Sequence, residues 1–253
     1  RMTSSEILDV VVLGDGLVGL ASARACAARA LSTCLVGRRR PGLGSAAAAG
    51  FLAPTIDPVR GGALAFTLAA RARYASYLDE LHAITGRVIP FALDGILRVP
   101  ATDRDAATLA ASTDDMSQWL SAGDVAHLEP ALVAPLGARF HHEDGMVDNQ
   151  RFLQALDEAV ALGAIPRLDG EARRVEMIGS MVAVELDGGR RLRARHVVIA
   201  TGAWAPLLQG VPRTIPVRPL RGQMMALSGA PISRPVFGYG GYLIPRAVDR
   251  QVY

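Results

Sequence analysis

The sequence predicts an α/β protein in which a domain built on a parallel sheet is interleaved with a second, mixed-sheet α+β domain. Three observations predict this fold class. The chain opens with the order strand, glycine-rich turn, helix, strand. Short strand patterns recur almost to its end, and amphipathic helical patterns separate them. A chain of 253 residues is long enough for one large domain or two small ones, each with a buried core.

The first elements form a βαβ unit. Residues 7–13 are a β-branched apolar run that predicts a buried strand, residues 17–30 predict an alanine-rich helix, and residues 32–36 predict a second strand. A unit of about 30 residues has the size of a right-handed parallel crossover. Residues 42–54 predict a loop, because they carry few large apolar side chains that could face a core.

The middle of the chain alternates helical and strand patterns. Apolar residues recur at helical spacing over residues 63–81, and residues 96–99 form a short apolar strand. Residues 103–120 again predict a helix. Ser121 and Asp124 have the spacing of a capping box, which predicts the start of a further short helix.

The second half of the chain combines one helix with several strands. The helix is predicted over residues 152–162, with Asp148 or Asn149 as its cap. The glycine turn at residues 187–189 predicts that the strands on either side of it form a hairpin. The predicted strands cover residues 181–186, 190–193, 196–200, 220–227, 242–245 and 250–253.

The composition excludes several chemistries. All 27 basic residues are arginine, so the chain lacks the lysine of a Walker-type phosphate loop and the amine that Schiff-base catalysis requires. The net charge of +3 is small and its arginines are scattered, which argues against a nucleic-acid partner. Two cysteines, Cys26 and Cys34, are too few for a disulfide framework and favour a reducing compartment. Charged residues interrupt the apolar stretch 7–36, so we expect no transmembrane segment and a cytoplasmic protein.

Gly14, Gly16 and Gly19 form a GxGxxG motif between the first strand and the first helix. In that context the first glycine permits a tight turn, the second lets backbone amides approach a pyrophosphate, and the third allows the helix to pack closely on the strand. The motif therefore predicts a Rossmann-like dinucleotide site. A purely structural glycine turn is the alternative.

Two positions depart from the usual pattern of such a site. The end of the second strand normally carries an acid that binds the ribose hydroxyls, whereas this chain has Gly37 followed by Arg38 and two more arginines. That arrangement keeps NADP open as an alternative ligand, unless the arginines form a solvated loop. Asp15 places a carboxylate beside the pyrophosphate position, which is unfavourable unless its side chain turns into solvent.

Several further segments resemble one family. Residues 10–19, the small-residue loop 44–52 and residues 197–204 look like the corresponding segments of the D-amino-acid-oxidase-type flavoproteins, and are most similar to the glycine oxidases of thiamine biosynthesis. The order and spacing of other segments agree with this resemblance, which covers nearly the whole chain: residues 94–95, 148–152, 221–223 and 241–246.

The resemblance implies that the cofactor is FAD and that NADP is the less favoured ligand. The loss of an acid at Gly37 then predicts FAD binding weaker by roughly 1.5–3 kcal/mol. Together the glycine motif and the resemblance assign these cofactor contacts: Gly14, Gly16, Leu17, Val18, Gly19, Gly37, Arg38, Ser45, Ala46, Ala49, Gly50, Phe51, Ala172, Thr201, Gly202 and Trp204.

The resemblance also implies the reaction, which is oxidative deamination of a small amino acid or secondary amine by hydride transfer to flavin N5. O2 or an electron-transfer partner is the acceptor. Such chemistry requires no lysine and no protein acid or base. Tyr242 and Phe51 are the implied substrate-binding residues. In the family an arginine that binds the substrate carboxylate lies beyond the point that corresponds to Tyr253, so the second domain looks truncated. A truncated chain is expected to lack activity on its own.

Other candidate sites carry less weight. The run His141, His142, Glu143, Asp144 could suggest a metal, but adjacent histidines on a strand point to opposite faces, so a solvated turn is the preferred interpretation and no metal is predicted. Ser45 has no matching histidine and acid for nucleophilic catalysis.

The predicted domains interleave along the chain. Residues 1–88 and 145–212 form the FAD-binding domain, and residues 89–144 and 213–253 form the substrate domain. Two alternative functions remain open: an FAD-binding homologue without catalysis and an NADP-binding reductase. A homo-oligomer also remains open as the assembly state.

Overall fold

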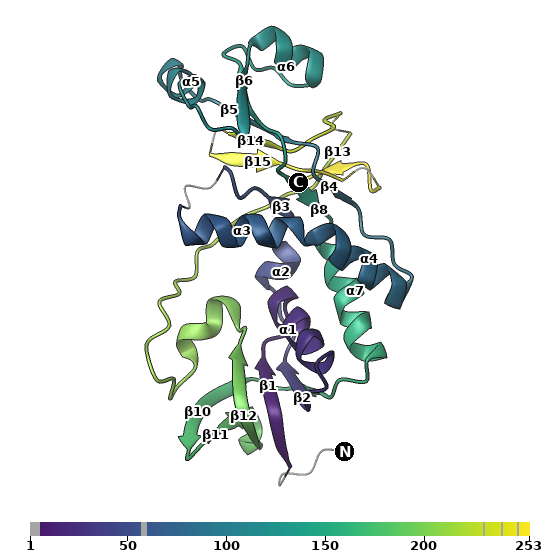
Figure 1. The fold of residues 1–253 in the computed structure, drawn as a ribbon, viewed down its shortest axis with the longest axis vertical. Helices are drawn as coiled ribbons and strands as arrows, with labels where there is room; N and C mark the ends of the chain where they lie inside the picture. The colour runs from purple at the N-terminus through teal and green to yellow at the C-terminus, as the bar shows by residue number, and fades with distance from the viewer. Residues whose placement is uncertain (1–5, 57–59, 230, 239, 247) are drawn as a thin grey trace. The chain divides into compact units, whose positions relative to one another are not determined.

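The computed structural model describes residues 6–56, 60–229, 231–238, 240–246 and 248–253. Contacts divide the chain into two units, and each is built from three separate segments (Figure 1). The first unit comprises Arg1–Ala47, Leu81–Arg87 and Gln150–Gly222. The second comprises Ala48–Glu80, Val88–Asn149 and Gln223–Tyr253.

The first unit is organised on a six-stranded sheet with the order β10-β11-β12-β1-β2-β9. Its central strands are parallel, and Val11 of β1 lies opposite Val197 of β12 and Cys34 of β2. The strands β10, β11 and β12 form an antiparallel meander at the other side of the sheet. The bounds are β1 (Ile7–Leu13), β2 (Thr33–Gly37), β9 (Arg167–Asp169), β10 (Ala172–Ile178), β11 (Met181–Leu186) and β12 (Arg191–Ile199).

The parallel strands β1 and β2 are mainly apolar and lie in the core of this unit. Val11, Leu13 and Cys34 are fully buried together with Val184 and Ala194 of the meander. Burial raises the pKa of the Cys34 thiol to about 11, so this thiol stays protonated at neutral pH. The helices that accompany the sheet are α1 (Leu17–Ala27), α7 (Asn149–Leu162), the single turn α2 (Gly44–Ala47) and the 3-10 segment Gly202–Leu207.

The second unit contains a five-stranded sheet with the order β15-β14-β5-β7-β6. Its core is formed by Leu97, Val99, Ala138 and Val236 on the strands and by Val125 on α6 (Ala122–Leu128). The strands are β5 (Ile96–Val99), β6 (Ser117–Leu120), β7 (Ala138–His141), β14 (Val236–Gly238) and β15 (Gly241–Leu243). Two small sheets accompany it, with the orders β3-β8-β4 and β13-β17-β16.

The remaining elements of the second unit are short. The small-sheet strands are β3 (Phe51–Leu52), β4 (Phe91–Ala92), β8 (Gly145–Val147), β13 (Leu227–Ser228), β16 (Pro245–Arg246) and β17 (Gln251–Val252). The helices are α3 (Gly62–Ala72), α5 (Asp103–Ala110), α6 and the first part of α4 (Tyr74–Thr85).

The predicted fold class is confirmed, but several elements differ from the prediction. The helix predicted over residues 103–120 is wrong: α5 ends at Ala110 and β6 begins at Ser117. Asp114 explains the break, because its carboxylate accepts hydrogen bonds from the Ser112 hydroxyl and the Met116 amide and so closes a turn. The capping box of Ser121 and Asp124 is confirmed.

Four further differences concern element boundaries. The helix predicted over residues 63–81 is divided at Arg73, whose amide bonds back to Ala70 in a tightened turn. The two strands predicted over 190–193 and 196–200 are one continuous strand, β12. Of the strand predicted over residues 220–227, only Leu227 lies in a strand, and the loop predicted over residues 42–54 contains α2 and β3.

The contacts also assign residues 48–80 to the second unit, whereas the sequence placed them in the first domain. That the two units act as an FAD-binding and a substrate domain stays a prediction.

A buried arginine ties three segments of the second unit together. The Arg246 guanidinium donates to the carbonyl oxygens of Ala49 (2.5 Å) and Val147 (3.0 Å) and to the Asn149 side-chain oxygen (2.6 Å). It also lies 3.6 Å from the Asp148 carboxylate, and both side chains are buried. Arg246 therefore satisfies backbone carbonyls that would otherwise be buried without a donor.

We expect the Arg246→Ala variant to lose about 3–5 kcal/mol of unfolding free energy, because it leaves buried acceptors and a buried carboxylate without their partner. Urea denaturation followed by circular dichroism measures the loss. The matched control is Arg104→Ala on the exposed face of α5, for which a change within about 0.5 kcal/mol is expected. Equal stability of Arg246→Ala and the control would contradict the assigned role.

Candidate functional site

A pocket of about 310 Å³ opens in the first unit, where β1, β2 and β12 end and the following turns begin. The carboxyl ends of parallel strands are the usual ligand site of such sheets, and this volume lies in the range of small-molecule pockets. The lining residues come from five segments: 13–16, 36–45, 170–173, 200–208 and Leu220.

The glycine turn after β1 brings three backbone segments into close contact. Gly14 has a φ of 107°, and a Cβ at this position would lie 2.2 Å from the Ala200 carbonyl oxygen at the end of β12. A Cβ at Gly19 would lie 1.7 Å from the Gly14 oxygen, so α1 packs directly on the turn. The structure thus requires glycine at both positions, as the motif predicts.

The N-terminus of α1 faces the small-residue loop. The Leu17 amide donates to the Ser45 hydroxyl oxygen at 3.0 Å, and the first turn of α1 carries no acid. A Cβ at Gly16 would lie 2.7 Å from that oxygen. Free amides and the dipole at a helix N-terminus favour an anion, and here the Ser45 oxygen occupies one such amide.

The wall formed by the end of β12 contains a hydroxyl without a partner. Thr201 Oγ1 is buried and has no hydrogen-bond partner among the described residues. Thr201 lines the pocket, as does Trp204, and the Arg40 guanidinium lies 5.1 Å from the centre of the Trp204 ring. An orphaned buried hydroxyl in a pocket wall is a polar group for a ligand to satisfy.

The Asp15 side chain does not turn into solvent, contrary to the expectation for a carboxylate beside a pyrophosphate. Its side chain is about 4% exposed, and its Oδ2 accepts a hydrogen bond of 2.7 Å from Arg167. The ion pair with Arg167 offsets the charge that would otherwise oppose a pyrophosphate.

The three arginines after β2 each have an acidic partner. Arg38 bonds Asp187 (2.6 Å) and Asp169 (3.3 Å), Arg39 bonds Asp157 (2.8 Å), and Arg40 lies 3.3 Å from Glu171. The Glu171 amide and, after it, Arg38 hold the pKa of Asp187 below its usual value, against an opposing effect of burial. These arginines therefore form ion pairs with the protein instead of presenting an unpaired cationic cluster to a 2′-phosphate.

The pocket brings together nine of the predicted cofactor residues: Gly14, Gly16, Gly37, Arg38, Ser45, Ala172, Thr201, Gly202 and Trp204. Leu17, Val18, Gly19 and Ala46 belong to the same unit but do not line this pocket, and Ala49, Gly50 and Phe51 belong to the second unit. Arg40, Gly170 and Arg173 also line the pocket but were not predicted as cofactor contacts. Arg40 belongs to the arginine run after β2, whereas no motif marks Gly170 and Arg173, because their position depends on the pairing of β2 with β9.

In the second unit the two predicted substrate residues are in contact. The rings of Phe51 and Tyr242 stack with centres 5.5 Å apart, and the ring of Phe237, the cross-strand partner of Tyr242, also stacks on Phe51 at 6.0 Å. The Tyr242 hydroxyl donates to the Met224 sulfur at 3.4 Å. The Arg98 guanidinium lies 5.9 Å from the Phe237 ring centre. The cluster thus combines aromatic faces, one hydroxyl and one nearby cation.

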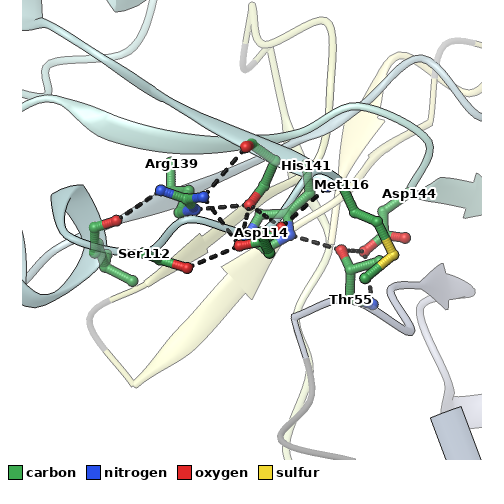
Figure 2. A network of polar contacts seen from close by, with 9 residues as sticks. Thr55, Ser112, Asp114, Met116, Arg139, His141 and Asp144 are labelled. Atoms are coloured by element: carbon green, nitrogen blue, oxygen red, sulfur yellow. Dashed lines mark hydrogen bonds and ion pairs between the residues drawn. The ribbon is translucent and has the colours of Figure 1, made fainter.

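The segment His141–Asp144 is a solvated turn only at His142 and Glu143, so the prediction is wrong for its two ends. His141 and Asp144 are buried, and Thr55 lies between them (Figure 2). The Thr55 hydroxyl donates to Asp144 Oδ2 at 2.7 Å and lies 2.6 Å from His141 Nδ1, while Arg71 donates to Asp144 Oδ1 at 2.6 Å. Because the Thr55 proton goes to Asp144, the neutral His141 ring donates from Nδ1 to Thr55.

The other ring nitrogen of His141 is buried without a partner among the described residues. Burial lowers the pKa of His141 to about 4. Asp114 opposes this shift, and Arg98, Arg139 and His142 add to it. Figure 2 shows that the same network continues through Asp114 to Arg139, which lies 2.9 Å from the Asp114 carboxylate. We find no group of three or more His, Cys, Asp or Glu side chains that could hold a metal in the part of the chain that the structure describes.

The pocket fits a dinucleotide. Its walls combine a glycine turn, a helix N-terminus and the orphaned Thr201 hydroxyl, which are groups that a pyrophosphate or a flavin can bind. Among the described residues, no helix has both the length and the apolar character needed to cross a bilayer.

Comparison with known proteins identifies the family. The profile of the FAD dependent oxidoreductase family (DAO) matches residues 9–253. The chain therefore belongs to this family, whose cofactor is FAD, and the predicted family and cofactor are confirmed.

Relatives of known sequence agree with this result. The chain is 32% identical over 257 aligned positions to the bifunctional protein ThiO/ThiG of Synechocystis sp., covering 96% of this chain and 38% of that protein. It is 29% identical over 255 positions to the tRNA 5-methylaminomethyl-2-thiouridine biosynthesis bifunctional protein MnmC of Chromohalobacter salexigens, with 93% and 34% covered. The chain thus spans well under half the length of these relatives.

Among solved structures, the glycine oxidase of Geobacillus kaustophilus matches with a TM-score of 0.87 at 26% identity, over 98% of this chain and 70% of that one. The iminodiacetate oxidase of Chelativorans sp. matches with a TM-score of 0.80 at 18% identity, over 96% and 70% of the two chains, which supports the fold.

We expect the Gly19→Ala variant to lose about 1–3 kcal/mol of unfolding free energy and to bind FAD more weakly, because the added methyl overlaps the Gly14 carbonyl and displaces α1 from the turn. Urea denaturation and quenching of flavin fluorescence measure the two effects. Gly123→Ala on α6 is the matched control, since its Cβ would meet nothing nearer than the Ser121 hydroxyl at 3.8 Å and should leave both unchanged or raise stability. A Gly19→Ala variant as stable as wild type would contradict this packing.

We also expect the stability of the chain to fall as the pH drops from about 6.5 towards 4, by up to about 1.4 kcal/mol per pH unit from His141. In this window the unfolded chain binds a proton on His141 whereas the folded chain, in which the His141 pKa is lowered to about 4, does not. Urea denaturation across this pH range should therefore give a shallower pH dependence for His141→Gln than for wild type. The control, His127→Gln at an exposed position, should keep the wild-type dependence. Parallel curves for wild type and His141→Gln would contradict the prediction.

Proposed function

We propose that this chain, as a member of the FAD dependent oxidoreductase family, takes part in the oxidation of the carbon–nitrogen bond of a small amino acid or secondary amine such as glycine, sarcosine or a D-amino acid. In this reaction the substrate loses a hydride from its α-carbon and a proton from its nitrogen. The resulting imine is hydrolysed to an oxo acid and ammonia or another amine. O2 then takes up the two electrons and yields peroxide, or an electron-transfer partner takes its place.

The observation that carries the proposal is the pocket of about 310 Å³ at the glycine turn, with the orphaned Thr201 hydroxyl in its wall. When FAD is bound, it supplies the acceptor of the hydride. The amides at the start of α1 would hold its pyrophosphate, and the Ser45 hydroxyl, now bonded to the Leu17 amide, can instead donate to a phosphate oxygen. The Thr201 hydroxyl would gain the partner that it lacks in the protein.

On the substrate side, we propose that Tyr242 and Phe51 contact the amino acid. Phe51 stacks on the rings of both Tyr242 and Phe237, and these contacts restrict its orientation. Among the described residues, the Tyr242 hydroxyl donates to the Met224 sulfur, which is a weak acceptor, and a carboxylate would accept the same proton more strongly. The protein thus contributes binding and orientation.

The ion pairs of the arginines after β2 favour this proposal over an NADP-binding reductase. A 2′-phosphate would have to displace Asp187 and Asp169 from Arg38, or Asp157 from Arg39. Titration with NADPH, and its loss on changing Arg38 and Arg39, would support the reductase instead.

We expect the intact protein to bind FAD, to show the absorption bands of a flavoprotein and to form peroxide with glycine or sarcosine. The measurements are an absorption spectrum, a fluorescence titration with FAD and a coupled peroxide assay. A second assay without oxygen records whether the amine bleaches the bound flavin. A colourless chain that takes up no FAD would overturn the proposal. Bound FAD that no amine bleaches would support the alternative of a non-catalytic FAD-binding homologue.

A further inference from the structure

The two positions at which the sequence departs from a usual dinucleotide site lie against each other. A Cβ built on Gly37 would lie 2.5 Å from both Cβ and Cγ of Asp15 and 2.8 Å from its Oδ1. The carboxylate of Asp15 therefore fills the space at the end of β2 where a side chain at residue 37 would begin. The missing acid at position 37 and the additional acid at position 15 therefore belong to one structural feature.

The Asp15 carboxylate is held with one oxygen engaged and the other directed away from its ion pair. Arg167 bonds Oδ2 at 2.7 Å, and it is the partner found for Asp15 among the described residues. Both Asp15 and Gly37 line the pocket. A buried carboxylate at the end of β2, with an oxygen left to accept a hydrogen bond, has the chemistry that dinucleotide sites use for the ribose hydroxyls.

The charges around Asp15 are balanced without the ligand. Arg167 also bonds Asp157 at 2.6 Å, and Asp157 bonds Arg39 at 2.8 Å. Negative and positive side chains therefore alternate along a row of ion pairs: Asp15, Arg167, Asp157 and Arg39. The bond from Arg167 sets the direction of the Asp15 carboxylate.

We propose that Asp15 is the residue that binds the adenosine ribose of FAD, in place of an acid at the end of β2. The inference rests on the proposed function, because it requires FAD in this pocket. Asp15 accepts a hydrogen bond from a free ribose hydroxyl and repels a 2′-phosphate, so it also selects FAD over NADP. Gly37 is required because any larger residue would overlap Asp15. The loss of affinity that Gly37 alone would predict is therefore offset.

The test compares binding of FAD and of its analogue with 2′-deoxyadenosine, both followed by flavin fluorescence. We expect wild type to bind the analogue roughly 10-fold more weakly than FAD, as for the loss of one charge-assisted hydrogen bond. Asp15→Asn should bind FAD roughly 10- to 100-fold more weakly than wild type and should no longer distinguish FAD from the analogue.

Asp157→Asn is the matched control. Asp157 is the other carboxylate bonded to Arg167, but it does not line the pocket. A general weakening of the ion pairs around Arg167 would therefore affect both variants. We expect Asp157→Asn to distinguish FAD from the analogue as wild type does. If the preference for FAD is lost equally in both variants, the inference is overturned.

A second variant keeps the inference testable if Asp15→Asn folds poorly. The double variant Asp15→Ala with Gly37→Glu returns the acid to the end of β2 and should restore both FAD affinity and the preference over the analogue. Gly37→Glu alone should unfold more easily, because the new side chain overlaps Asp15 and brings two carboxylates together. Failure of the double variant to restore binding, or an unchanged preference in Asp15→Asn, would overturn the inference while leaving the proposed function intact. Wild type that binds no FAD would overturn both.

Discussion

The first unit depends on one close approach of backbone to backbone. The turn after β1, the start of α1 and the end of β12 meet where Gly14, Gly19 and Ala200 are in contact, and there is no room for a single additional carbon atom. The pocket exists because these segments meet with so little side-chain bulk, which leaves amides and carbonyls at its wall. The position of Thr201, the direction of α1 and the contact of Asp15 with Gly37 all follow from this packing.

Arginine performs the same task at several buried points of the structure. Arg71, Arg139 and Arg246 are buried, and each bonds at least two acceptors. The acceptors of Arg139 and Arg246 lie on different segments of the chain, and Arg71 joins α3 to the neighbouring residues Glu143 and Asp144. A guanidinium has five donors in a planar array, whereas an ammonium group has three donors at a single atom. A chain whose 27 basic residues are all arginine can therefore join segments through buried cations, which is a structural use of its composition in addition to its net charge.

The sequence predicted the features that depend on neighbouring residues. The strand, glycine turn and helix at residues 7–27 and the capping box at Ser121 are local patterns, and the structure contains them. The sequence did not predict the features that depend on the pairing of distant segments or on a single side chain. The turn that ends α5 is formed by the Asp114 carboxylate, which no helical periodicity reveals, and the burial of His141 depends on Thr55, far away in the sequence. The contact between Asp15 and Gly37 is of the same kind: both residues were noticed as departures, but only the pairing of β1 with β2 relates them.

The interleaving of the two units has a consequence for how the chain is made. β1 leaves the ribosome well before its partner on one side, β12, which follows nearly 190 residues later, since Val11 pairs with Val197. Until then β1 has an open edge, which in a nascent chain invites pairing with other strands. The second unit closes later still, when Arg246 reaches the carbonyls of Ala49 and Val147. Each unit can complete its folding only after the last of its three segments has been synthesised.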